Sequence, residues 1–120
     1  MKALLVGGIF MLFANTAIAG DVFEIVSTKF KEGTPIEKQK KAMAKLNAVV
    51  KEFEGFKSRD YYYSADNGRW VDFVVWSDQE LAIKASQSAM NDPKAGEVFS
   101  LMDENTSIFS HYERVGGTAH

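Results

Sequence analysis

Cysteine is absent from this 120-residue chain, and histidine occurs only twice, at positions 111 and 120. The protein therefore forms no disulfide, carries no lipid on an N-terminal cysteine, and holds its fold by core packing alone. Metal sites need clustered His, Cys or carboxylate groups, and no such cluster surrounds either histidine, so we predict no metal. A basic excess is also lacking, since 14 Lys and Arg stand against 16 Asp and Glu. This balance argues against a nucleic-acid partner.

A short apolar run opens the chain. Lys2 precedes apolar residues 3–13, and Ala17 and Ala19 place small residues where a signal peptidase reads them. The run is shorter than the roughly 20 apolar residues that a membrane-spanning helix needs. We therefore predict a cleaved signal peptide over residues 1–19 and one domain over residues 20–120. The product would lie in the periplasm or outside the cell, with no membrane contact after cleavage.

The first half of the domain reads as a strand followed by a helix. Residues 22–30 are dense in Val, Phe, Ile and Thr, which favours a strand. Residues 34–37, Thr-Pro-Ile-Glu, have the pattern of a capping box with Thr34 as the cap, so a helix is expected to start there and to end at Gly55. Its predicted apolar stripe consists of Ile36, Met43, Leu46, Val50 and Phe53.

An Asn-Gly pair marks a tight turn between two further strands. Residues 56–64 and 69–76 flank residues 65–68, Ala-Asp-Asn-Gly, which predicts an antiparallel hairpin. In the second strand both faces are mainly apolar, so both should be covered. One face carries Trp70, Asp72, Val74 and Trp76.

The last third contains two helices and a strand. Residues 77–80, Ser-Asp-Gln-Glu, predict a second capping box and a helix that runs to Met90. Asp92 and Pro93 predict a short further helix, followed by a last strand over residues 106–115. The short helix has a predicted stripe of Ala95, Val98, Phe99 and Met102. The order β-α-β-β-α-β predicts an α+β, ferredoxin-like fold with an antiparallel four-stranded sheet and helices on one face.

Several segments together resemble the antibiotic biosynthesis monooxygenase-like (ABM) domains of the dimeric α+β barrel superfamily. The segments are Gly55-Phe56, the Asp-Asn-Gly hairpin, Trp70-Val71-Asp72, Val75-Trp76-Ser77, Phe99-Ser100-Leu101-Met102-Asp103 and His111-Tyr112-Glu113. The resemblance implies a homodimer whose sheets meet face to face, and a small-molecule pocket between sheet and helices. Haem-degrading members need a histidine after Trp76 to ligate iron. Residues 78–102 contain none, so we expect no haem. The resemblance to cofactor-free members implies no other cofactor.

Few residues could perform chemistry in this frame. Asp72 is a carboxylate within an apolar strand, either paired with Arg59, Arg69 or a group of a second copy, or acting as a general base. His111 on the last strand is either a structural group or a proton relay. Asp72 and His111 are therefore the candidate catalytic residues. The candidate ligand-pocket residues are Trp70, Trp76, Tyr62 and Phe99.

Two functions from different classes remain open. The protein is either an exported, cofactor-free monooxygenase that acts on an apolar or phenolic substrate, or a dimer without catalytic activity. The second class includes a module that binds a small hydrophobic ligand and a scaffold for interactions with other proteins.

Overall fold

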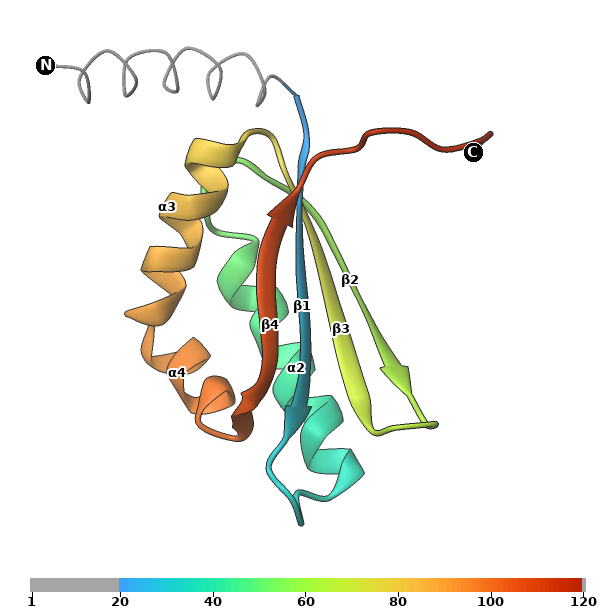
Figure 1. Cartoon of the computed structure of the whole chain (residues 1–120). Helices are drawn as coiled ribbons and strands as arrows, with labels where there is room; N and C mark the ends of the chain where they lie inside the picture. Colours follow the sequence, from blue (N-terminus) through green and yellow to red (C-terminus); the bar gives the residue numbers. More distant parts are fainter. Residues whose placement is uncertain (1–19, 120) are drawn as a thin grey trace, which may run out of the picture.

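The computed structural model describes residues 20–119, which form a four-stranded antiparallel sheet with three helices packed on one face (Figure 1). The sheet order is β2-β3-β1-β4, and every neighbouring pair is antiparallel. This confirms the predicted α+β, ferredoxin-like fold. The elements are β1 (Val22–Phe30), α2 (Ile36–Val50), β2 (Phe56–Ser64), β3 (Arg69–Trp76), α3 (Gln79–Met90), α4 (Pro93–Phe99) and β4 (Met102–Tyr112).

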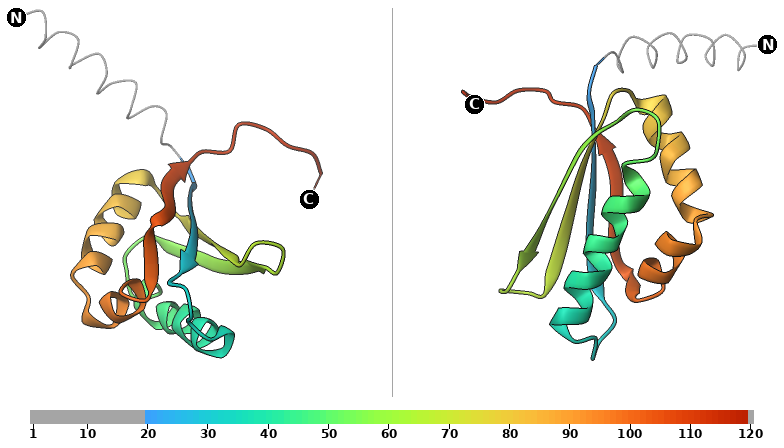
Figure 2. Two further views of the ribbon diagram at one scale, coloured as in Figure 1. Left: turned by 60° about the horizontal axis from the view of Figure 1, so that its bottom comes forward. Right: turned by 180° about the vertical axis from the view of Figure 1, so that it is seen from behind.

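The predicted signal peptide over residues 1–19 lies outside the described residues. Among the helices that the structure describes, none combines the length and the apolar character needed to cross a membrane. Residues 113–119 leave the sheet and run away from the body of the molecule (Figure 2).

Both helix starts differ in detail from the predicted capping boxes. The residue before α2 is Pro35, without a side-chain cap, because the Thr34 hydroxyl donates to the Lys31 carbonyl instead. For α3 the cap is Asp78 rather than Ser77, and its Oδ1 accepts a hydrogen bond of 2.8 Å from the Leu81 amide. The positive end of the helix dipole also stabilises a carboxylate at this position.

The last strand begins and ends earlier than predicted. Met102 was expected to extend the stripe of the short helix, but α4 ends at Phe99 and the chain turns directly into β4. Pairing with β1 sets this start, because Met102 lies opposite Phe30 and the Lys31 amide donates to the Leu101 carbonyl at 2.9 Å. Pairing ends with Phe23 and Tyr112, so β4 ends there as well.

Two apolar clusters fill the space between sheet and helices. The first joins Trp70 and Phe30 to α2 and α4, and the second joins Trp76, Val22 and Val74 to α3. The buried face of α2 includes Met43 and Leu46 of the predicted stripe, but it contains Val49 rather than Val50, and Ile36 is 38% exposed. The buried α2 residues are Ala42, Met43, Leu46 and Val49.

The opposite face of the sheet carries no helix of residues 20–119 (Figure 2). Alternation along the strands sends odd-numbered residues of β1 and β3 to this open face and even-numbered ones toward the helices. The face is largely apolar. Its apolar and aromatic residues are Phe23, Ile25, Tyr62, Val71, Phe73, Val75, Ile108 and Tyr112.

Candidate functional site

Asp72 forms a buried two-point ion pair with Arg59 on the neighbouring strand. Arg59 Nε and Nη2 donate to the two carboxylate oxygens at 2.9 and 3.0 Å. The remaining nitrogen, Nη1, donates to the Met43 carbonyl at 2.8 Å and to Asn47 Oδ1 at 2.7 Å. The guanidinium also lies 4.2 Å from the ring centre of Tyr61. The pair therefore ties β2 and β3 to α2 and compensates the buried charge of Asp72.

A second carboxylate, Glu24, is mostly buried on the helix-facing side of β1. Register places it opposite Val74 on β3 and His111 on β4. The indole Nε1 of Trp76 donates to Glu24 Oε1 at 3.1 Å, and His111 Nε2 lies 3.6 Å from the same oxygen. The side chains of Glu24 and His111 are only 12% and 14% exposed. The imidazole of β4 and the indole of β3 thus both lie close to one carboxylate oxygen of Glu24 on β1.

The surroundings of Glu24 raise its pKa from 4.5 to about 7. Burial is the largest cause, because it disfavours the charged form, and the negative charge of Asp72 adds to it. The hydrogen bond from Trp76 and the positive charge of Arg59 act in the opposite direction but do not cancel the rise. Glu24 can therefore gain or lose a proton close to neutral pH.

His111 lies next to Glu24 but forms no hydrogen bond with it. Burial lowers its pKa below the usual 6.5, which favours the neutral ring. Its Nε2 is buried without a hydrogen-bond partner in the part of the chain that the structure describes, since 3.6 Å is too long for a hydrogen bond. The ring of Phe109 packs edge-on against the imidazole of His111, with 5.2 Å between the two ring centres. A neutral imidazole nitrogen that faces an exchangeable carboxyl group can accept or return one proton.

The four predicted pocket residues do not lie together. Trp70 belongs to the first core cluster and donates to Gln39 Oε1 at 2.9 Å, whereas Trp76 lies in the second cluster beside Glu24. Phe99 packs against the first cluster. Tyr62 is 61% exposed on the open face of the sheet, on the far side from both tryptophans.

The sequence interpretation missed Glu24. The alternation of β1 places it on the same face as Val22, Val26 and Thr28, so a carboxylate on a core-facing position was the available signal. Within residues 20–119 no group of three His, Cys, Asp or Glu residues is arranged to hold a metal ion.

Comparison with solved structures places the fold among ABM domain proteins. SnoaB, a cofactor-independent oxygenase from Streptomyces nogalater, superposes with a TM-score of 0.67 at 19% identity, covering 85% of this chain and 100% of SnoaB. A candidate antibiotic biosynthesis monooxygenase from Bordetella bronchiseptica has a TM-score of 0.68 at 18% identity, with 80% and 98% covered. Another from Nitrosomonas europaea has a TM-score of 0.61 at 18% identity, with 84% and 96% covered.

No family model and no curated protein matches the chain. At this level of identity the comparison shows an ABM-like fold, and one structure that shares it is of a protein of unknown function.

Proposed function

We propose that this protein is a cofactor-free monooxygenase in which Glu24 removes a proton from an apolar or phenolic substrate. One observation carries the proposal: a mostly buried carboxyl group with a pKa of about 7 lies beside a buried imidazole nitrogen that has no hydrogen-bond partner within residues 20–119. A general base works best when its pKa is close to the working pH. The oxygenase activity of SnoaB, which shares the fold, supports the same class of reaction.

The proposed reaction converts a substrate CH2 group beside a ring into a carbonyl, with O2 as the oxidant. Ionised Glu24 takes one proton from the carbon, and the carbanion reduces O2 as a carbon–oxygen bond forms. The resulting hydroperoxide loses the second hydrogen of that carbon as a proton, the O–O bond breaks, and water leaves. One O2 is consumed, one oxygen atom enters the product and the other becomes water.

The neighbours of Glu24 have separate roles in this proposal. Trp76 fixes the orientation of the carboxylate through the indole hydrogen bond, and neutral His111 receives the proton from Glu24 and passes it to the peroxide oxygen. Asp72 is a positioning residue, because its charge raises the pKa of Glu24 while its own oxygens are held by Arg59.

Export and dimerisation complete the proposal. We propose that residues 1–19 direct the chain across a membrane and are removed, so that the enzyme works in the periplasm or outside the cell. A second copy would cover the open face of the sheet, and the apolar character of that face supports this arrangement.

Turnover of anthrone, a three-ring carbon acid, tests the proposed chemistry. Wild-type protein should form anthraquinone with one O2 consumed per product. Glu24→Gln should lower kcat by about a hundredfold or more, since a general base typically contributes about 10²- to 10⁴-fold. Glu104→Gln removes an exposed carboxylate from β4 and should leave kcat unchanged. Equal rates for wild type and Glu24→Gln would contradict the role of Glu24. Saturable binding of anthrone without O2 consumption would instead support a ligand-binding module.

A further inference from the structure

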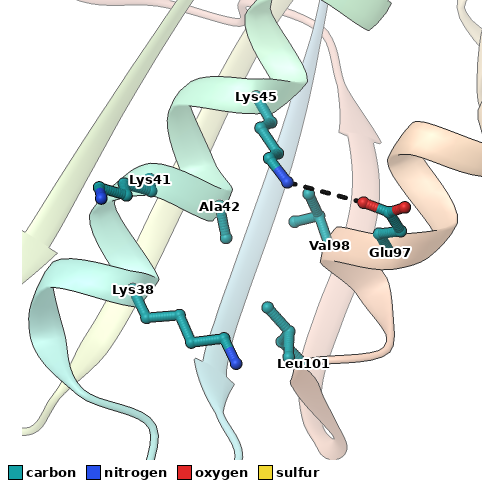
Figure 3. Close-up of a pocket in the computed structure, with 7 residues that line it drawn as sticks. All are labelled: Lys38, Lys41, Ala42, Lys45, Glu97, Val98 and Leu101. Atoms are coloured by element: carbon teal, nitrogen blue, oxygen red, sulfur yellow. Dashed lines mark ion pairs between the residues drawn. The ribbon is translucent and has the colours of Figure 1, made fainter.

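A cavity of about 330 Å³ lies between α2 and α4, away from Glu24 (Figure 3). Its apolar lining consists of Ala42 from α2, Val98 from α4 and Leu101 from the turn that follows. These residues belong to, or pack against, the first core cluster, whereas Glu24 contacts Trp76 of the second cluster. The cavity is therefore a different place from the site proposed above.

Three lysines on a single face of α2 lie beside this apolar lining. Lys38, Lys41 and Lys45 are spaced three and four residues apart, which places them on one side of the helix. Figure 3 shows the ammonium group of Lys38 extending into the gap between the helices, while that of Lys41 points away from it. Within residues 20–119 Lys38 has no ion-pair partner, so its charge is available to a ligand.

The acidic side of the cavity consists of one residue, Glu97 of α4. Its carboxylate lies 3.6 Å from Lys45 Nζ, and this pair spans the cavity (Figure 3). Both side chains are largely exposed, so the pair contributes little to stability and can be exchanged at low cost. A carboxylate brought by a ligand could take the place of Glu97 beside Lys45 and also contact Lys38.

We propose that this cavity binds a small amphipathic carboxylate, with its anionic head between Lys38 and Lys45 and its apolar body on Ala42, Val98 and Leu101. At about 30 Å³ for each water-sized group, the volume admits about eleven non-hydrogen atoms. A medium-chain fatty acid or a single-ring aromatic acid has this size. A phosphate headgroup would use much of the space and leave too little for an apolar body.

Octanoate is the probe that tests this site, added to protein purified after expression of the full chain and followed by amide NMR. Shifts should concentrate on α2 and α4. Lys38→Gln should weaken binding about fivefold, as expected for one partly exposed charge. Glu97→Gln should tighten binding about threefold, because the competing carboxylate is gone. The matched control is Lys40→Gln, which removes the same charge from the same helix outside the cavity.

Three results would overturn the proposal. The first is an absence of saturable shifts on α2 and α4. The second is equal weakening by Lys38→Gln and Lys40→Gln, which would indicate general attraction to a positive helix. The third is equal affinity for octanol, which would mean that the lysines do not recognise a carboxylate. None of these results depends on Glu24, so anthrone turnover and octanoate binding succeed or fail separately.

Discussion

Glu24 illustrates how one residue acquires its properties from three strands. On its own strand it is a carboxylate between apolar neighbours, which would be costly to bury in the charged form. Trp76 contributes a hydrogen bond, His111 contributes a neutral ring, and Asp72 contributes a second negative charge nearby. The result is a carboxyl group whose protonation changes near neutral pH rather than in acid.

We predict that this group makes the stability of the protein fall as pH rises through neutrality. The native pKa of Glu24 is about 7 against 4.5 in the unfolded chain, so the native state binds more protons between these values. Its stabilising contribution is full below pH 4.5 and is lost as pH rises through about 7. The loss is about 3 kcal/mol, at about 1.4 kcal/mol per pKa unit.

Urea unfolding at several pH values measures this loss of stability. Glu24→Gln should abolish the pH-dependent loss, and the variant should be more stable than wild type at pH values above about 8. His111 acts in the other direction, since its lowered pKa reduces stability as pH falls below 6.5. His111→Gln therefore serves as the matched variant, because it removes the acid-side slope and should leave the neutral-side slope in place. A flat profile from pH 5 to 8 in His111→Gln, which lacks the opposing slope, would contradict the raised pKa of Glu24.

Reasoning from the sequence identified Asp72 as a candidate site residue but did not identify Glu24. A carboxylate on an apolar strand predicted a partner, and Arg59 was one of the three partners considered. Glu24 gave the weaker signal, because β1 also carries polar Ser27, Thr28 and Lys29. The contact between Glu24 and His111 depends on the register of β1 against β4, which shifts at an irregularity between Ser27 and Lys29. No local pattern reveals that shift.

At the level of elements, the accuracy of the prediction followed the strength of local signals. The hairpin strands Phe56–Ser64 and Arg69–Trp76 agree with the prediction at every boundary, because an Asn-Gly turn sets both inner ends. The end of α3 at Met90 also agrees, because Pro93 follows closely. The start of β4 was wrong because helical spacing extends to Met102 while β1 determines the actual conformation. Tertiary pairing outweighs local periodicity there.

Gly55 joins two elements and gives a prediction at this scale. It has a φ of +89°, and a Cβ added there would lie 2.8 Å from the Cβ of Leu81 on α3. Its carbonyl also accepts a hydrogen bond from the Ser77 amide at 2.8 Å, which joins the start of β2 to the end of β3. Gly55→Ala should therefore lower the free energy of unfolding by about 3 kcal/mol, from left-handed backbone strain plus overpacking.

Gly33→Ala provides the matched control in urea unfolding. Gly33 has a nearly identical φ of +87°, but nothing lies within 4 Å of an added Cβ. Only the backbone strain applies there, and we expect a loss of about 1 kcal/mol. Equal losses at the two glycines would mean that α3 moves aside without cost and that its contact with Gly55 does not matter.

At the level of the whole molecule, the helix layer leaves two different surfaces. The helix side contains both core clusters, the Glu24 group and the lysine-lined cavity. The open side presents apolar side chains from all four strands and has no covering helix among residues 20–119. Monomeric soluble proteins rarely expose a continuous apolar surface of this kind. Strand β3 carries apolar residues on both of its faces. The helices cover one face, and a partner that covers the open face would explain the other.

A second copy of the chain is the occupant that we predict for this face, and sedimentation velocity at micromolar concentration should detect a dimer. Ile108 on β4 is 62% exposed there, so Ile108→Lys should leave the fold intact and place two like charges across the symmetric interface. The variant should sediment as a monomer. Ile83→Lys on α3, where the isoleucine is 41% exposed on the helix side, is the matched control and should remain dimeric. A monomeric wild type would rule out the face-to-face arrangement. Dissociation by both variants would indicate an interface that includes the helices, so the comparison locates the contact as well as detecting it.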